Sequence, residues 1–127
     1  MKQVLFVGLG GFLGSISRYK LGGLFLRCAP DTHFPFSTFL INVIGCLAIG
    51  ILAGLAETRD YFSSDARLFL FTGLLGGFTT FSAFGYEGLY LLRRGEVGTA
   101  ACYAGLSVLL GWFAVWLGYK LISFGMR

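Results

Sequence analysis

The sequence predicts an all-α membrane protein with one integral membrane domain over residues 1–127. Two observations lead to this fold class. Of the 127 residues, 56% are hydrophobic and only 13% are charged, a balance far more apolar than that of a soluble domain. The apolar residues also fall into four segments, each close to the ~20 residues that cross a bilayer. Four such segments leave room only for short tails and loops.

The four predicted spans cover about residues 4–26, 36–56, 68–92 and 99–124. Short polar stretches separate them at residues 28–35, 57–65 and 93–96, and they contain the Pro, Asp, Glu and Gly that interrupt helices. The last one, RRGE, predicts a tight turn. Because apolar sequence resumes after every break, a cleaved signal peptide on a soluble product is not expected.

Basic residues are almost evenly divided between the two sides of the predicted membrane domain. One side collects Lys2, Arg59, Arg67, Lys120 and Arg127, and the other collects Lys20, Arg27, Arg93 and Arg94. Orientation follows the Lys/Arg excess on cytoplasmic loops. Two interpretations remain open: insertion in both directions with two copies meeting antiparallel, or one orientation fixed by a dominant charge. Scattered basic residues also argue against nucleic-acid binding.

The first span combines small residues with a basic one. Gly10 and Gly14 form a GxxxG pair, which permits close approach of another helix. Arg18 lies deeper than the other basic residues. It either anchors the helix by snorkelling to the interface, or it forms an electropositive vestibule that gathers anions.

Polar or small residues recur every four positions in the second and fourth spans, so each set lies on one face of its helix. The sets are Thr38, Asn42 and Cys46, and Thr99, Tyr103, Ser107 and Gly111. The Asn42 amide needs a partner in lipid, either a neighbouring helix backbone or a polar path. Two matched stripes favour a lined conduit over a single interhelical contact.

Aromatic and polar residues share the second half of the third span. Phe81 and Phe84 lie three apart, on one face. Such a stripe is usually core or lipid-facing, but the positive ring edges also suit an anion beside a narrow path. Ser82 could add a hydroxyl. Glu87 is the only carboxylate inside a predicted span, and it suits proton coupling, interface exposure or pairing.

The stretch GGFTTF, residues 76–81, predicts a break in the third span. The pair Gly76 and Gly77 weakens the helix, and the hydroxyls of Thr79 and Thr80 compete with its hydrogen bonds. Irregular backbone at membrane depth must be buried in protein or line a cavity, where freed carbonyls suit a small cation. The alternative is an unbroken helix in which Gly73 and Gly77 serve close packing.

Taken together, these residues resemble the Fluc (CrcB) family of fluoride channels over essentially the whole chain. Three ordered motifs carry the resemblance: GFLGSISRY at residues 11–19, TFLINVIG at residues 38–45, and GGFTTFSAF at residues 76–84. The resemblance implies four-helix subunits in an antiparallel, dual-topology homodimer with two fluoride pores. It also implies passive fluoride export across the bacterial inner membrane, which gives resistance to fluoride.

The resemblance assigns expected roles to individual residues. Asn42 matches the pore asparagine, and Phe81 and Phe84 match phenylalanines whose ring edges face fluoride. Arg18 matches a vestibule arginine. A structural sodium ion at the dimer centre is expected on the backbone carbonyls of Gly76 and Thr79. Further polar pore residues are implied at Tyr103, Ser107, Thr38 and Ser82, where Ala83 departs from relatives that carry a hydroxyl.

Two other function classes are less well supported. A small multidrug-type, proton-coupled exporter matches the length and charge balance, but it needs a carboxylate deep in the first helix, and residues 4–26 contain none. A membrane enzyme needs a cluster of catalytic side chains. His33 stands alone, and the three cysteines include no CxxC pair. The sequence therefore predicts a protein that is not an enzyme.

Overall fold

The structure is a computed structural model and describes residues 1–28, 33–59 and 61–125. In these ranges every regular element is helical. In chain order the elements are α1 (Lys2–Cys28), α2 (Phe36–Arg59), α3 (Ser64–Arg67), the π-helix η1 (Leu68–Leu75), α4 (Gly76–Phe78), α5 (Phe81–Arg93) and α6 (Val97–Gly125). Helix α1 contains the first predicted span, α2 the second and α6 the fourth, while the third falls in the series α3 to α5, which is interrupted at Thr79 and Thr80. The all-α prediction is confirmed.

Three stretches among the described residues are long and apolar enough to cross a membrane: Phe36–Glu57, Ser64–Arg93 and Val97–Phe124. Helix α1 has the length, with 27 residues, but the polar residues between positions 15 and 20 lower its hydropathy. The protein is therefore a multi-pass membrane protein, while the first predicted span, residues 4–26 in α1, stays a prediction.

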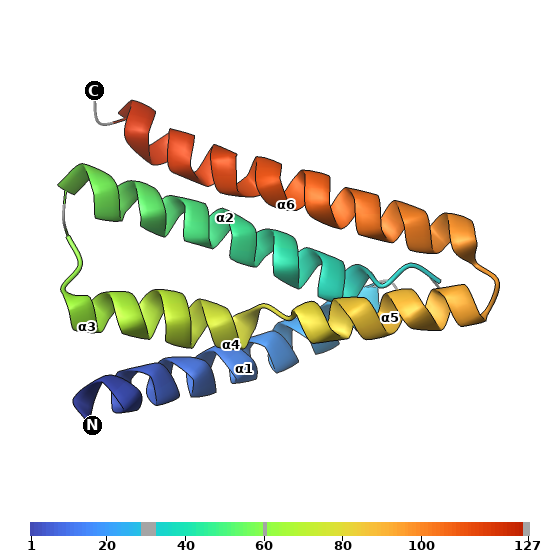
Figure 1. Cartoon of the computed structure of the whole chain (residues 1–127), viewed down its shortest axis with the longest axis horizontal. Coiled ribbons are helices and arrows are strands. Elements are labelled where there is room, and N and C mark those ends of the chain that lie inside the picture. The colour runs from blue at the N-terminus through green and yellow to red at the C-terminus, as the bar shows by residue number, and fades with distance from the viewer. Residues whose placement is uncertain (29–32, 60, 126–127) are drawn as a thin grey trace.

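The helices associate in two pairs (Figure 1). Helices α2 and α6 lie side by side along most of their length and run in the same direction, and α1 lies against η1 and α4. The start of α1, the end of α2 and the end of α6 lie at one end of the molecule. The α5–α6 turn and the start of α2 lie at the other. At that turn Gly95 has a φ of 78°, which favours glycine.

Glycines allow both pairs to pack backbone against backbone. A Cβ built on Gly14 would overlap the carbonyl of Leu74, and one built on Gly77 would overlap the carbonyl of Gly11. On the other pair, a Cβ on Gly50 would overlap the carbonyl of Val115. Close approach through small residues is a main source of helix association in membranes. The packing role predicted for the glycines of the first and third spans is confirmed.

The predicted break in the third span is also confirmed, and it falls at the two threonines. Thr79 has ψ of 160° and Thr80 has φ of −151°, so both residues are extended between α4 and α5. The neighbouring Gly76 and Gly77 remain helical. Glycine packing and the break are therefore compatible, because they occupy different residues of one motif.

Threonine hydroxyls stabilise both ends of the break. Thr79 Oγ1 donates to the carbonyl of Leu75 at 2.9 Å, which closes the last turn before the break. Thr80 is the N-cap of α5, where its Oγ1 accepts from the N–H of Ala83 at 3.2 Å. The two adjacent threonines thus end one helix and begin the next.

Candidate functional site at the break in the third span

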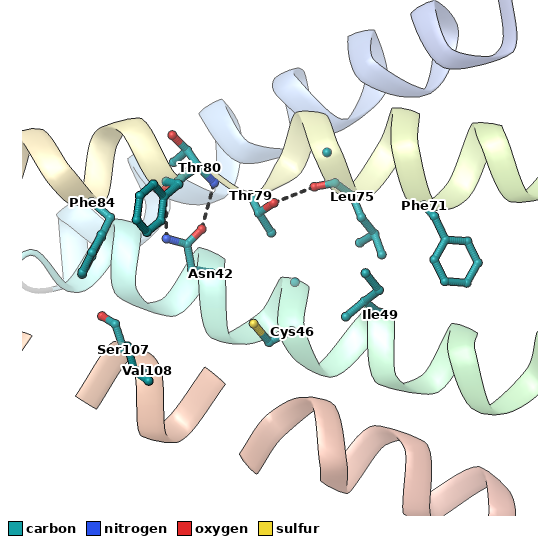
Figure 2. Close-up of a pocket in the computed structure, with 13 residues that line it drawn as sticks. Asn42, Cys46, Ile49, Phe71, Leu75, Thr79, Thr80, Phe84, Ser107 and Val108 are labelled. Atoms are coloured by element: carbon teal, nitrogen blue, oxygen red, sulfur yellow. Dashed lines mark hydrogen bonds between the residues drawn. The ribbon is translucent and has the colours of Figure 1, made fainter. Parts of the chain in front are cut away.

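Asn42 of α2 holds the break by pairing with both backbone groups of Thr80. Its Nδ2 donates to the Thr80 carbonyl at 3.1 Å, and its Oδ1 accepts from the Thr80 N–H at 2.9 Å. Figure 2 shows the amide pointing from α2 at this residue. A buried backbone group without a partner is strongly unfavourable in a membrane. The Asn42 amide therefore supplies the two backbone hydrogen bonds that Thr80 would otherwise make with the neighbouring turns of a continuous helix.

The break also redirects two helical donors away from their usual carbonyls. In a continuous helix the N–H of Thr80 would donate to the Gly76 carbonyl, and the N–H of Ala83 to the Thr79 carbonyl. Here the first donates to Asn42 and the second to Thr80 Oγ1. The carbonyls of Gly76 and Thr79 thus lose their helical donors, and these are the two carbonyls expected to hold a cation.

Arg18 reaches the break from α1. Its Nη1 donates to the Thr79 carbonyl at 3.4 Å, a contact that neither the snorkelling nor the vestibule interpretation predicted. The same side chain lines a hollow of about 900 Å³ with Lys20 and Arg27, which extends to Thr80. A basic hollow that ends at the break would attract anions towards it.

A cavity of about 410 Å³ opens beside the break, between α2, the interrupted stretch Ser64–Arg93 and α6. Its wall includes most of the residues predicted for the pore and the cation, namely Asn42, Gly76, Thr79, Phe81, Phe84 and Ser107, together with Thr80. Figure 2 shows Ser107 and Val108 lining it from α6, opposite Asn42 and Cys46 on α2. The tertiary structure thus brings residues from three separate parts of the chain to one cavity.

Ser107 differs from the other polar residues of the cavity. Its hydroxyl is buried and has no hydrogen-bond partner among the described residues. Buried polar atoms in proteins nearly always have a partner. The Ser107 hydroxyl is therefore free to donate to a ligand in the cavity.

The two predicted phenylalanines lie together at this cavity but differ in burial. The ring centroids of Phe81 and Phe84 are 5.4 Å apart, with an angle of 37° between the ring planes. Phe84 is half-buried and also contacts Tyr103, with ring centroids 5.0 Å apart. Phe81 is 84% exposed. One ring is thus packed against the rest of the chain, while the other projects from it.

Glu87 gathers two other predicted pore residues into a separate cluster. Its Oε1 accepts from Thr38 Oγ1 and its Oε2 accepts from Tyr103 Oη, both at 2.7 Å. Thr38 is 7% exposed and Tyr103 is fully buried. Of the alternatives for Glu87, pairing is therefore what the structure contains. Neither Thr38 nor Tyr103 lines the cavity at the break.

Ser82 takes a third position. It is exposed, and its hydroxyl lies 3.2 Å from Thr80 Oγ1, outside the lining of the cavity at the break. The predicted polar track of Thr38, Ser82, Tyr103 and Ser107 is thus divided among three places within one chain.

Sequence reasoning missed the roles of two residues that shape the site, although it had placed Thr80 at the break. Thr80 is the residue that Asn42 clamps, and its place directly before a helix, where Thr is a favoured N-cap, was an available signal. Gly45 is the second, because a Cβ built there would overlap Thr79 Cγ2. No pattern in α2 distinguishes this glycine from its neighbours.

These features define a class of protein: a helical, multi-pass membrane protein in which the stretch Ser64–Arg93 is interrupted beside a largely apolar cavity that contains a few polar groups. Interrupted membrane helices of this kind surround substrate and ion sites.

Comparison with known proteins gives the family. The family described as "CrcB-like protein, Camphor Resistance (CrcB)" matches residues 5–119. The fluoride-specific ion channel FluC of Methylobacillus flagellatus is 54% identical over 127 residues, which is 100% of this chain and 99% of the relative. The proteins of the same name from Thermus thermophilus (48% over 121 residues, 95% of each chain) and Nitratidesulfovibrio vulgaris (47% over 118 residues, 93% of this chain and 94% of the relative) are also similar. The chain belongs to the CrcB-like family, which confirms the resemblance carried by the three motifs.

Proposed function

We propose that this protein is a fluoride-selective ion channel that lets fluoride leave the cell passively, down its electrochemical gradient, and so gives resistance to fluoride. The carrying observation is the cavity at the break, where Asn42, Phe84 and Ser107 meet. Relatives that share about half of the residues over nearly the whole chain bear the name of a fluoride-specific channel. A channel requires no catalytic group, so the protein is not an enzyme.

Donors at the cavity suit a small, strongly hydrated anion. Fluoride gives up its water only if hydrogen-bond donors replace it. The Asn42 amide has two N–H groups, of which one is used by Thr80, so one stays available. The Ser107 hydroxyl is a second donor. The hydroxyls of Tyr103 and Thr38 would join the path only by leaving Glu87.

The rings of Phe81 and Phe84 would form the narrow part of the path. The edge of a phenyl ring carries partial positive charge, so an anion can pass along ring edges that exclude bulk water. Phe84 is fixed against Tyr103. Phe81 projects from the subunit, so a second copy of the chain would complete the narrow part of the path beside it.

A second copy in the opposite orientation is part of the proposal. With α1 as the first of four spans, the near-equal numbers of basic residues on the two sides favour insertion in both directions. Two antiparallel subunits would place their breaks face to face and form two pores, in the inner membrane of a bacterium.

A sodium ion between the two breaks would hold such a dimer together. The carbonyls of Gly76 and Thr79 are suited to bind it, because their helical donors go elsewhere. Arg18 donates to the Thr79 carbonyl. Because a carbonyl oxygen has two lone pairs, it can accept this hydrogen bond and also coordinate a sodium ion. The ion would supply positive charge at the centre of the dimer and would not itself be transported.

The alternative of a proton-coupled multidrug exporter has no support in this chain. Helix α1 contains no carboxylate, and Glu87 accepts hydrogen bonds from Thr38 and Tyr103.

The test is efflux from liposomes that contain the purified protein and are loaded with potassium fluoride. Adding valinomycin removes the charge build-up, so fluoride efflux should accelerate at once, while chloride should stay inside. Efflux of both anions at one rate would contradict selectivity, and no efflux of either would contradict the channel.

Three variants divide this proposal into its parts. Ser107→Ala removes one donor but no existing hydrogen bond, so it should fold normally and conduct more slowly. Phe81→Ile and Phe84→Ile should also slow efflux while the dimer stays intact. Unchanged efflux in all three would remove this cavity from the path.

Two further measurements address the dimer and the ion. Reporters fused to the C-terminus should be active on both sides of the membrane, and activity on one side alone would exclude dual topology. Exchange of sodium for N-methylglucamine during purification should shift the protein from dimer to monomer on size exclusion, and an unchanged dimer would exclude the proposed role of sodium.

A further inference from the structure

A shallow hollow of about 420 Å³ lies on the outer face of α5, away from the cavity at the break. Its lining is Tyr86, Leu89, Tyr90, Arg93 and Arg94. The first four follow the spacing i, i+3, i+4, i+7, so they form one continuous strip along the helix. This hollow is not used by the proposed conduction path.

The strip is apolar and aromatic at one end and basic at the other. Tyr86 is 72% exposed, Leu89 is 54% exposed and Tyr90 is 51% exposed, so none of the three is needed to fill the core. Arg93 closes the membrane-spanning stretch Ser64–Arg93. With a rise of about 1.5 Å per residue, Tyr86 lies roughly 10 Å deeper than Arg93 along the helix axis.

The two guanidinium groups differ in how they are held. Arg94 Nη1 donates to Tyr90 Oη at 2.9 Å, and Arg94 Nε donates to Glu96 Oε1 at 3.2 Å. Its guanidinium also lies 5.5 Å from the centre of the Tyr90 ring. Arg93 makes no hydrogen bond or ion pair with any residue that the structure describes. One arginine is thus fixed in place, and the other is available.

The charge in this hollow is unbalanced. Arg93 and Arg94 carry two positive charges, and Glu96 provides one negative charge, whose second oxygen lies 3.2 Å from His33 Nδ1. One positive charge is left over at the depth where lipid headgroups lie. This excess matches a group with one negative charge, such as a phosphodiester.

We propose that this hollow binds an anionic phospholipid of the surrounding bilayer. The phosphate would pair with the free guanidinium of Arg93 and lie near the fixed guanidinium of Arg94. The acyl chain would lie along Leu89 and Tyr86, and Tyr90 would occupy the interface between them. Tyrosine is enriched at this depth because its ring is apolar and its hydroxyl is polar.

The shape of the strip decides between possible sources of the phosphate. Inorganic phosphate would use the two arginines and gain nothing from the exposed apolar residues one and two turns deeper. A phospholipid uses both ends at once, because its charged and apolar parts are separated in the same direction. The lipid is therefore the occupant that fits the whole hollow.

Native mass spectrometry of the detergent-solubilised full-length protein tests this proposal. The probes are phosphatidylglycerol and phosphatidylcholine with identical acyl chains. The wild type should retain phosphatidylglycerol in preference, and Arg93→Gln should reduce that retention by about fivefold, the effect of one basic residue near an anionic headgroup. Arg93→Lys keeps the charge and should retain the lipid nearly as well as the wild type.

Lys120→Gln is the matched control, because it removes one positive charge from an exposed position at the other end of the molecule. It should leave retention unchanged. Equal retention of the two lipids by the wild type, or equal retention of phosphatidylglycerol by Arg93→Gln and wild type, would overturn the proposal. Loss of the bound lipid on addition of excess inorganic phosphate would overturn it in favour of a free-anion site.

A final arm examines whether protein covers this face instead of lipid. Tyr86→Cys in a background without the three natural cysteines should react with a membrane-dissolved maleimide and should not form a disulfide between two copies. Disulfide-linked dimers would assign the hollow to a protein interface and overturn the lipid site.

Discussion

Two regions of this protein solve the problem of a helix in lipid in opposite ways. Where α1 meets η1 and α4, glycines bring backbones into contact, and no polar side chain is required. One turn further, at the break, Thr79 and Thr80 leave the helix. Asn42 pairs with the N–H and the carbonyl of Thr80, and the threonine hydroxyls pair with the Leu75 carbonyl and the Ala83 N–H. The first region gains stability from close packing, and the second depends on a few polar side chains that must all be present.

This difference predicts which substitutions destabilise each region. In the glycine region, adding a single methyl group is harmful, because the neighbouring atoms belong to a backbone that cannot move aside. At the break, adding or removing one hydrogen-bonding atom is harmful, because water is absent and cannot replace it. The two regions are therefore sensitive to different kinds of substitution.

The largest effect is expected for Gly14→Ala. Its new methyl group would overlap the Leu74 carbonyl and lie close to the Phe78 nitrogen, so the protein should lose about 3 kcal/mol of stability or more. Unfolding of the purified protein in detergent by heat or SDS measures this loss. Gly8→Ala on the same helix is the control, because a Cβ there meets nothing within 4 Å. Similar losses in both variants would contradict the packing argument.

Asn42→Ala should have the next largest effect, because it leaves the N–H and the carbonyl of Thr80 without partners. We expect a loss of about 2–3 kcal/mol and little remaining fluoride efflux. If Asn42→Ala were as stable as the wild type, the amide would not be what holds the break.

Tyr103→Phe should have a smaller effect, about 1.5–2 kcal/mol, because it removes one of the two hydroxyls that donate to Glu87. Tyr119→Phe is a matched control, since Tyr119 donates to Glu57 at the same 2.7 Å but in an exposed position. That variant should change the unfolding free energy by less than about 0.5 kcal/mol. Equal effects would show that burial does not strengthen the Glu87 cluster. A double-mutant cycle with Glu87→Gln measures the coupling directly.

The smallest effect is expected at the ion pair between Lys2 and Asp65, where nitrogen and oxygen lie 2.8 Å apart. The Lys2 side chain is 75% exposed, so water and salt screen the attraction. Lys2→Gln should change the unfolding free energy by no more than about 0.5 kcal/mol, and by less as salt is added. A loss comparable to that of Asn42→Ala would mean that this end of α1 is tied down far more strongly than its exposure indicates.

The fold class and most of the helices could be predicted from local patterns in the sequence. Composition and four apolar runs required helices, because only a helix satisfies its own backbone hydrogen bonds along a single membrane segment. The GxxxG pairs predicted close packing, and the motif GGFTTF predicted an interruption. Spacing of four residues also placed Thr38 and Asn42 on one face of α2, and Tyr103 and Ser107 on one face of α6. These are local properties, since each depends on the chemistry and spacing of neighbouring residues.

Which of those residues contact one another could be seen only in the tertiary structure. Asn42 contacts Thr80 across 38 positions and Arg18 reaches Thr79 across 61, and such partners depend on how helices pair and rotate. In the same packing Thr38 and Tyr103 donate to Glu87, whereas Ser107 lines the cavity at the break, although their spacing suggested one track. Helix periodicity fixes the face on which a side chain lies, but its partner is chosen by the geometry of the neighbouring helix.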